Sequence, residues 1–335
     1  MRHGDIRAAL RVRVLEVPRA RGETIATHLI ELERRTLHGH FSRDLPPIAS
    51  VAPGDTVRCR TLDGGWGLEP PRLDGSARRC FEPRDPELDS GHALIGPFEI
   101  RGAKPGMTLE VKISVVEPGA WGWTRAGGWP TALNQRLGVA DGDQHLLVWT
   151  LDAAGGSGRD QFGRSVRLGP FLGVIGMPPD QPGIHSTIPP RAWGGNMDCK
   201  ELVAGSRLLL PIASPGARVS FGDGHAAQGD GEVSQLAIEC PMERVELTFD
   251  LKDDPPLTTP IAETSAAWIT FGFHESLDEA AAIALDAMLD LMGRRLGLTR
   301  KDALALASVV VDLRVTQMVN RARGVHARLT HDAIR

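Results

Sequence analysis

The sequence predicts a mainly β protein, with a β-sandwich or β-barrel body and a smaller C-terminal α/β portion. Three observations support this prediction. Short alternating apolar runs, set off by Pro-Gly turns, recur through roughly the first 250 residues. No G-x-G-x-x-G run follows a strand pattern, so nothing indicates a dinucleotide-binding fold. After Asp254-Pro255-Pro256 the pattern changes to Ala/Leu-rich segments with helical start and stop signals.

The β prediction rests on three dipeptides, Pro53-Gly54, Pro105-Gly106 and Pro215-Gly216. Proline fixes its φ angle and glycine accepts a positive φ, which suits the central pair of a type II turn. Each pair precedes an alternating apolar run, such as the one from Leu109 to Val115. A period of two is typical of a half-buried strand. We therefore expect a strand after each turn.

Two helices are predicted in the C-terminal portion. Ser276, with Glu279 three residues later, matches a capping box and opens an Ala/Leu/Met-rich segment that Gly297 can end. Thr299 can cap a second helix that runs to about residue 312.

The chain is long enough for two or three subdomains. We expect an N-terminal β-sandwich region at residues 1–165, a β-barrel region with glycine-rich active-site loops at 166–253, and a C-terminal α/β region at 254–335. The proline-rich Asp254-Pro255-Pro256 marks the second boundary, and residues 152–158 are the most linker-like stretch before it.

Composition and charge exclude several classes of partner. The 335 residues carry a formal net charge of −4 and no dense Lys/Arg block, which argues against nucleic-acid binding. No run reaches the ~18 apolar residues of a membrane-spanning helix. The first residues lack the features of a signal peptide, and the four cysteines show no CxxC spacing. We therefore expect a cytoplasmic protein with reduced thiols.

Residues 194–232 concentrate ionisable side chains among glycines, which let tight loops direct side chains to a common point. Two similar motifs, Asp223-Gly224-His225 and Asp230-Gly231-Glu232, lie in this block. An Asp-Gly pair alone is typical of a hairpin turn. Since a hairpin tip does not also require a histidine, an amide and a second carboxylate, we expect functional roles for His225 and Glu232.

Asp198 and Lys200 lie in the same block, and each admits two interpretations. Asp198 could cap a helix N-terminus, or it could bind a metal ion or orient a metal ligand. Lys200 could be a surface lysine, or it could stabilise a developing anion.

Two upstream histidines, His185 and His92, are further candidates for metal ligands. Imidazole is the commonest metal ligand in proteins. A set of His, Asp and Glu side chains on loops suits Zn²⁺ or a similar divalent ion with one open position. A lone histidine is usually structural, and no pair has the H-E-x-x-H spacing, so the pattern leaves the ligand geometry open.

These residues resemble the acetamidase/formamidase family of amide hydrolases. The resemblance covers nearly the whole chain and is strongest at residues 185–190, 194–200 and 222–232. It implies hydrolysis of small linear amides, or of arylacetamides, to a carboxylate and ammonia. It also implies a β-sandwich or β-barrel body that assembles as a homo-oligomer, a dimer or higher. Cys199 and Ser234 depart from the residues that the family often has there, which leaves the substrate open.

Amide hydrolysis requires a nucleophile, a group that stabilises the oxyanion and a proton for the leaving amine. We expect a water activated by a divalent metal ion, with Zn²⁺ as the expected ion. The expected ligands are His185, Asp198 and His225, with His92 in reserve.

Two further residues are assigned catalytic roles. Glu232 is expected to transfer the proton from water to nitrogen, and Lys200 to lie near the oxyanion. The rival route within the enzyme class uses Cys199 as a covalent nucleophile. The alternative outside that class is a ligand-binding β-sandwich protein without catalytic activity.

Overall fold

The computed structural model describes residues 12–18 and 24–335 of the chain. Within these residues the strands form three sheets, so the prediction of a mainly β fold is confirmed. The prediction about export rests on the first residues, which lie outside the described range. Among the described helices, none has the length and apolar character needed to cross a bilayer.

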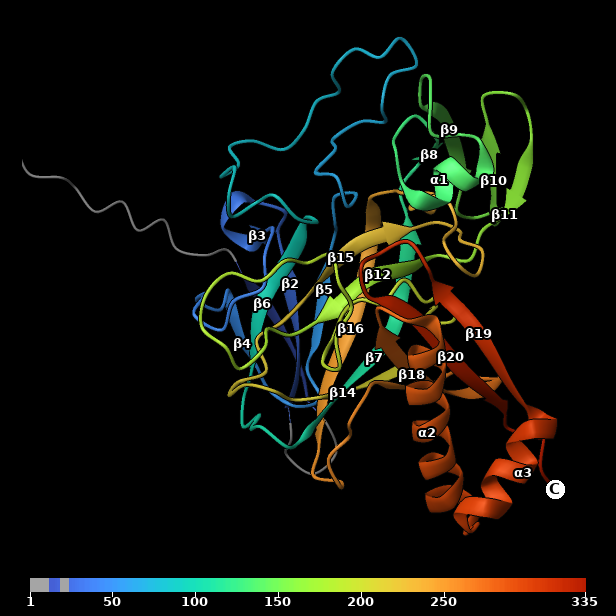
Figure 1. Cartoon of the computed structure of the whole chain (residues 1–335). Coiled ribbons are helices and arrows are strands. Elements are labelled where there is room, and N and C mark those ends of the chain that lie inside the picture. The colour runs from blue at the N-terminus through green and yellow to red at the C-terminus, as the bar shows by residue number, and fades with distance from the viewer. Residues whose placement is uncertain (1–11, 19–23) are drawn as a thin grey trace, which may run out of the picture.

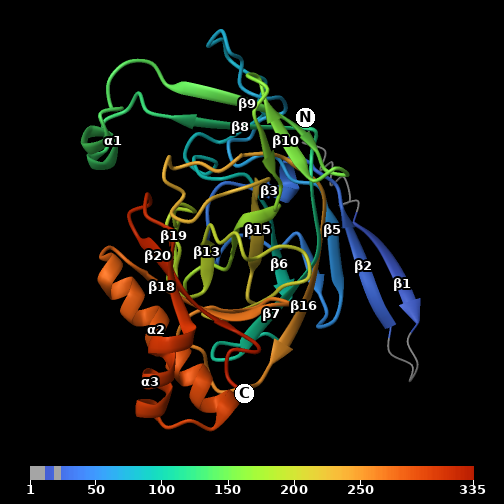
Figure 2. The same ribbon diagram turned by 90° about the vertical axis from the view of Figure 1, so that its right-hand side faces the viewer.

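The largest sheet runs from one side of the molecule to the other (Figure 1 and Figure 2). Within the described residues it has ten strands, in the order β1-β2-β5-β16-β7-β14-β17-β18-β20-β19. All neighbours pair antiparallel except β2 and β5. The bounds are β1 Arg13–Pro18, β2 Thr24–Ile30, β5 Thr56–Cys59, β7 Thr108–Pro118, β14 Arg207–Pro211, β16 Met242–Lys252, β17 Ile261–Glu263, β18 Ala267–His274, β19 Val311–Gln317 and β20 Arg323–Thr330.

Two smaller sheets complete the described β structure. One has the order β13-β12-β15-β6-β3, with β4 paired to β6, and the other has the order β11-β10-β9-β8. The bounds of the first are β3 Leu37–His38, β4 Ala49–Val51, β6 Leu94–Ile100, β12 Phe171–Gly176, β13 Gly194–Asn196 and β15 Val219–His225. Those of the second are β8 Trp121–Ala126, β9 His145–Asp152, β10 Ser157–Asp160 and β11 Ser165–Arg167.

The main core lies between the ten-stranded sheet and the sheet that contains β6 and β15. Phe98 of β6 stacks on Phe221 of β15, with ring centroids 5.7 Å apart, and on Phe249 of β16, at 6.3 Å. All three rings are fully buried. Burial of apolar surface contributes about 25 cal/mol of stability per Å² removed from water. The buried rings therefore stabilise the face-to-face packing of the two sheets as a sandwich.

The three Pro-Gly turns occur as predicted. Gly54, Gly106 and Gly216 all have positive φ angles. Each turn is closed by a hydrogen bond between residues three apart: Asp55 N to Ala52 O, Met107 N to Lys104 O and Ala217 N to Ser214 O. They lead into β5, β7 and β15.

The two predicted C-terminal helices are confirmed. α2 spans Leu277–Leu296 between the caps Ser276 and Gly297, and α3 spans Arg300–Val310 with Thr299 as its N-cap. α3 ends before residue 312 because the chain enters β19 at Val311. α2 lies beside β18 and β20, and α3 lies beside α2 and the start of β19 (Figure 1). Two short elements, η1 (Arg34–Thr36) and α1 (Ala132–Leu137), lie elsewhere in the chain.

The ten-stranded sheet takes strands from all three predicted regions. The division at residues 165 and 253 therefore does not coincide with a break in this sheet, and it stays a prediction. Residues 152–158 are not a linker, because β9 and β10 pair directly across them with Asp152 opposite Ser157.

Candidate functional site

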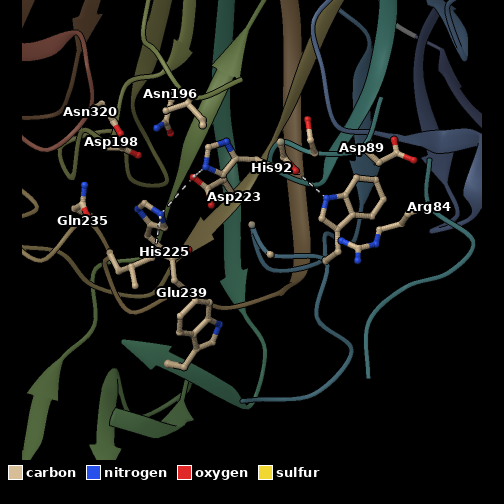
Figure 3. A pocket seen from close by; sticks show the side chains of 18 of the residues that line it. Arg84, Asp89, His92, Asn196, Asp198, Asp223, His225, Gln235, Glu239 and Asn320 are labelled. Atoms are coloured by element: carbon tan, nitrogen blue, oxygen red, sulfur yellow. Dashed lines mark hydrogen bonds and ion pairs between the residues drawn. The ribbon is translucent and has the colours of Figure 1, made fainter. Parts of the chain in front are cut away.

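A cavity of about 660 Å³ lies where segments far apart in the sequence meet. Its lining includes Gly64, His92, Trp123, Asn196 and Asn320 together with a set of buried acids. Figure 3 shows His92, Asp223, His225 and Glu239 pointing toward one another in this cavity. The acids and the histidine that they surround form the most polar part of the lining.

The centre of the cavity is His225, held between two carboxylates. Its Nε2 lies 3.5 Å from Oδ2 of Asp223 and 3.4 Å from Oε1 of Glu239. Asp223 and His225 are two residues apart on β15, so they project from the same face of the strand. Glu239 reaches His225 through an isolated β-bridge between the two residues. All three side chains are buried.

Asp198 and Glu232 complete the acidic cluster. Both are buried and both have positive φ angles, 48° and 47°. Asn320, 122 residues from Asp198 in the sequence, donates its amide N–H to Oδ2 of Asp198 at 3.2 Å. Positive φ is uncommon outside glycine and is found at functional sites held by their surroundings.

Gly173 on β12 makes room for this cluster. A Cβ at that position would lie 2.6 Å from Oδ2 of Asp223, 2.8 Å from Oδ1 of Asp198 and 2.9 Å from Cε1 of His225. Any side chain there would displace these polar atoms. The arrangement of the cluster therefore requires glycine at position 173.

The cluster meets the requirements of a divalent cation. Asp198, Asp223 and His225 form one group whose potential ligand atoms lie within 4.8 Å of one another, and His225, Glu232 and Glu239 form another. Within the described residues, the buried Oδ1 atoms of Asp198 and Asn196 have no hydrogen-bond partner. Buried oxygens without a partner are costly unless a ligand satisfies them. These side chains can therefore hold a divalent metal ion.

A hydrogen-bond chain sets the orientation of the histidine. Gln228 donates from its Nε2 to the backbone oxygen of Asp198 at 2.7 Å, which directs its Oε1 toward Nδ1 of His225, 3.0 Å away. Nδ1 therefore donates to Gln228, and Nε2 faces the carboxylates. This arrangement, with the distal ring nitrogen held by a second residue, is typical of metal-binding histidines.

Burial and mutual repulsion distribute the protons of the cluster unevenly. Burial raises the pKa of Asp198 to about 7. Burial, followed by the neighbouring Asp198, raises the pKa of Glu232 well above its ordinary value. Burial lowers the pKa of His225, but Glu239 and Asp223 outweigh it and raise this pKa well above 6.5. Burial raises the pKa of Asp223, but His92 and His225 lower it to about 2.

The structure brings together four of the six residues selected from the sequence. Asp198, His225, Glu232 and His92 all line the cavity. Nε2 of His92 lies 3.9 Å from Oδ2 of Asp223, and Nδ1 of His92 bonds Oγ1 of Thr187 at 2.9 Å.

His185 and Lys200 are not among the residues that line the cavity. Nε2 of His185 bonds the carbonyl of Gln181 at 3.1 Å, and the backbone of His185 pairs with Phe41. Nζ of Lys200 lies 3.3 Å from Oδ1 of Asp230. Both side chains thus have partners outside the cavity.

The structure also decides two alternatives from the sequence and describes the environment of Cys199. Asp198 does not cap a helix, since it follows β13 and precedes a turn. Asp223-Gly224 is not a hairpin turn but lies within β15. Cys199 is fully buried, and burial raises the pKa of its thiol to about 12.

Sequence reasoning missed Asp223, Glu239, Asn196 and Asn320 as site residues. For Asp223, the sequence pattern indicates only a turn motif. Glu239 carried a usable signal, because it is a single acid within the apolar run Leu-Ala-Ile-Glu-Cys-Pro at 236–241, and a charge in such a run needs a buried partner. The two asparagines carried no comparable signal.

The sequence model of the acetamidase/formamidase family matches residues 26–184 and 182–327 of the chain. The chain is similar to a candidate formamidase of Schizosaccharomyces pombe, 29% identical over 253 residues, covering 60% of each protein. It is also similar to a formamidase of Methylophilus methylotrophus, 26% identical over 248 residues, covering 59% of this chain and 60% of that protein. The chain thus spans about three fifths of the length of these two relatives.

The fold is similar to that of a solved structure, an acetamidase from Bacillus halodurans. The TM-score is 0.77 and the sequence identity is 27%, over 90% of this chain and 97% of that one.

Proposed function

The chain belongs to the acetamidase/formamidase family, and we propose that it is an amidohydrolase that cleaves a small linear amide, of the formamide or acetamide type or an arylacetamide, to a carboxylate and ammonia. The observation that supports this most directly is the buried cluster of Asp198, Asp223, His225, Glu232 and Glu239 in the wall of an open cavity. Four carboxylates buried around one histidine destabilise the fold unless they serve a ligand.

We propose that Asp198, Asp223 and His225 hold a divalent metal ion, with Zn²⁺ as the expected ion, because their ligand atoms lie together and one Asp198 oxygen has no other partner within the described residues. A bound divalent cation lowers the pKa of a water molecule and polarises an amide carbonyl. His92, which lies beside Asp223, replaces His185 in this proposal as the second histidine of the site.

Glu232 is the proposed general base and acid. Burial and the neighbouring Asp198 raise the pKa of Glu232 well above its ordinary value, which suits a group that accepts a proton and then releases it to a leaving amine. Asn196, whose Oδ1 has no partner within the described residues, is available to accept an N–H of the substrate amide. Lys200 is assigned a positioning role, since its ammonium group is paired with Asp230.

A covalent mechanism through Cys199 is disfavoured by the position of this residue. The thiol is fully buried, is not among the cavity-lining residues and has its pKa raised to about 12 by burial. A thiol with such a pKa has almost no nucleophilic thiolate at neutral pH.

Ammonia release from formamide, acetamide, propionamide and an arylacetamide tests the proposed function. We expect turnover of at least one of these amides, loss of activity after extensive chelation, and recovery when Zn²⁺ is added back. Metal analysis and a metal-dependent rise in thermal stability provide readouts that do not depend on turnover. Asp223→Asn should lose both activity and metal binding, whereas Asp278→Asn, in the exposed first turn of α2, should lose neither.

The absence of ammonia from all of these amides would favour the ligand-binding alternative. Full activity in a chelated, metal-free preparation would exclude the metal-dependent mechanism while leaving the amidase assignment in place.

We also propose that the enzyme acts in the cytoplasm as a homo-oligomer. All four cysteines are free thiols, which suits a reducing compartment. Val309 is 80% exposed, and Leu304 and Leu313 are about half exposed, on α3 and β19 at one edge of the ten-stranded sheet. Light scattering of the purified protein should give a mass at least twice that of one chain, and Leu313→Glu should reduce it.

A further inference from the structure

Arg125 links the active-site cavity to a second cavity. It lies on β8, two residues after Trp123, and it lines both the cavity of about 660 Å³ and an adjoining one of about 520 Å³. Gly65 and Trp123 also line both cavities. The two hollows therefore meet at Arg125, and a molecule bound at the acidic cluster can extend toward this side chain.

Arg125 differs from the neighbouring arginines in having no carboxylate within ion-pairing distance among the described residues. In the adjoining cavity Arg78 pairs with Asp63 at 2.6 Å and Arg72 pairs with Glu69 at 3.0 Å. Within residues 12–18 and 24–335, the one hydrogen-bond acceptor of Arg125 is the amide oxygen of Gln144, at 3.2 Å, and its guanidinium lies over the rings of Trp123 and Trp129. Its guanidinium is exposed to the cavity and not neutralised by a carboxylate.

Electrostatics around Arg125 favour an added anion. Burial and the like charge of Arg78 lower the pKa of Arg125, while Glu239 of the cluster acts in the opposite direction. The guanidinium thus lies within electrostatic reach of the catalytic cluster and beside a second cation. A carboxylate is the group that best matches a guanidinium, since it accepts two parallel hydrogen bonds.

The size of the cavity leaves room for a longer acyl chain. Acetamide has four heavy atoms and occupies roughly 100 Å³, on the order of three water molecules. The cavity is about 660 Å³, and its lining beyond the cluster includes the apolar side chains of Trp123, Trp66 and Leu236. These apolar side chains suit the methylene groups of an extended substrate.

The distribution of charge also determines where in the cavity a negatively charged group of a substrate would bind. Glu82, Asp85 and Asp89 line the part of the cavity formed by residues 82–92. The cations next to this part already have carboxylate partners, since Arg84 is hydrogen-bonded to Glu82 and Arg34 pairs with Asp89 at 2.6 Å. Among the described residues, the arginines at this part are therefore already paired with carboxylates, whereas Arg125 is free to attract the carboxylate of a substrate.

We propose that the preferred substrates are linear amides whose acyl chain ends in a carboxylate, with the amide at the Asp198–Asp223–His225 cluster and the carboxylate on Arg125. The inference rests on the proposed amidase function. In the reaction, water adds to the carbonyl carbon, the C–N bond breaks and nitrogen leaves as ammonia. The monoamide of a dicarboxylic acid plus water therefore gives the dicarboxylate and ammonium, with no other reactant.

The test compares charged and neutral amides of matched length. Ammonia release is measured for malonamate, succinamate and glutaramate, and for uncharged counterparts such as 4-oxopentanamide, which replaces the carboxylate of succinamate by a methyl ketone. We expect kcat/KM to be at least about tenfold higher for one of the anionic amides than for its neutral counterpart.

Substitutions at residue 125 test whether Arg125 causes the preference for anionic amides. Arg125→Gln should raise KM for the preferred anionic amide by about 10- to 50-fold and change the values for neutral amides by less than about threefold. Arg125→Lys should retain part of the preference. Arg159→Gln, an exposed arginine on β10 outside both cavities, is the matched control and should leave all values unchanged. Circular dichroism verifies that each variant is folded.

The outcomes separate the inference from the proposed function. If neutral amides are hydrolysed and the anionic amides are no better, or if Arg125→Gln affects both classes equally, the inference is overturned and the amidase function stands. If no amide is hydrolysed, the proposed function fails, and calorimetry with succinamate still decides the binding site. Binding to the wild type that is no tighter than binding to Arg125→Gln would then overturn the inference.

Discussion

Nζ of Lys200 lies 3.3 Å from Oδ1 of Asp230, and each of these residues is two positions from a carboxylate of the cavity, Asp198 and Glu232 respectively. Arg314 of β19 strengthens this connection, because it donates to Oδ2 of Asp230 and, at 2.6 Å, to Oε1 of Glu201. The ion pairs connect the two loops that carry Asp198 and Glu232.

Lys200→Ala should therefore lower kcat by only about 3- to 10-fold, with KM nearly unchanged, because it loosens a loop rather than removing a reacting group. Lys200→Arg should restore most of the activity, and Lys301→Ala, at an exposed lysine on α3, is the control. Steady-state kinetics on the best amide measure these effects. A loss of more than about 10³-fold in Lys200→Ala would instead support the direct oxyanion role inferred from the sequence.

Gly173→Ala should abolish activity. The added methyl group would lie within 3 Å of atoms of Asp223, Asp198 and His225, so the cluster must move to admit it. A displacement of about 1 Å at reacting groups can cost 10²-fold in rate. Gly169→Ala is the matched control, since it has open space around the new Cβ and no positive φ. Equal activity of the two variants would contradict the geometry described for the cluster.

Cys199→Ala should retain at least about half of the wild-type activity, because the thiol is buried and its pKa is raised to about 12. Kinetics and iodoacetamide labelling of the folded wild type check the same point. Rapid inactivation by iodoacetamide, protected by an amide substrate and absent in Cys199→Ala, would revive the covalent route.

The affinity of the metal-free protein for Zn²⁺ should rise with pH. Burial raises the pKa of Asp198 to about 7, so below this pH the carboxyl is protonated and must lose its proton before it binds a cation. His225, whose pKa lies well above 6.5, adds a second proton to be released. Affinity should change by at least about tenfold per pH unit between pH 6 and 7, measured by competition with a chelator. An affinity independent of pH would exclude these residues as ligands.

Asp55→Asn should destabilise the fold without altering the acidic cluster, since Asp55 does not line the cavity. Asp55 accepts hydrogen bonds from Nε2 of His28 at 3.0 Å, from Ala26 N at 2.9 Å and from Ala52 N at 3.1 Å, which join β2 to the turn before β5. A hydrogen bond to a charged group contributes about 1.5–3 kcal/mol to the stability of a protein. We expect a decrease of about 2 kcal/mol in the free energy of unfolding at pH 7, measured by urea denaturation.

The same variant has a defined pH dependence. Burial raises the pKa of Asp55, but the bonds from His28, Ala26 and Ala52 outweigh it and lower the pKa below 3.8. A depressed carboxyl pKa contributes stability that is present above the unfolded value and is lost as pH falls through the folded value. The difference between wild type and variant should therefore shrink below pH 4. A constant difference down to pH 3 would contradict this role of the Asp55 carboxylate.

Several features could be predicted from the sequence because they are local. A Pro-Gly turn such as Pro105-Gly106 depends on the φ preferences of two adjacent residues, and the caps Ser276 and Gly297 depend on the unpaired backbone groups of a single helix end. The glycine-rich block likewise indicated that Asp198, His225 and Glu232 would lie together, since glycines within one segment allow such loops.

Other features depend on how distant strands pair, and no local pattern encodes that pairing. Glu239 joins the site only because its backbone bridges to His225, and Asn320 reaches Asp198 across 122 residues. Lys200 is not among the cavity-lining residues and pairs with Asp230, 30 residues further along the chain. The sequence by itself determined the elements and the kinds of side chain available for chemistry. The tertiary structure decided which of them meet, because contacts between distant segments are set by sheet register and packing rather than by neighbouring residues.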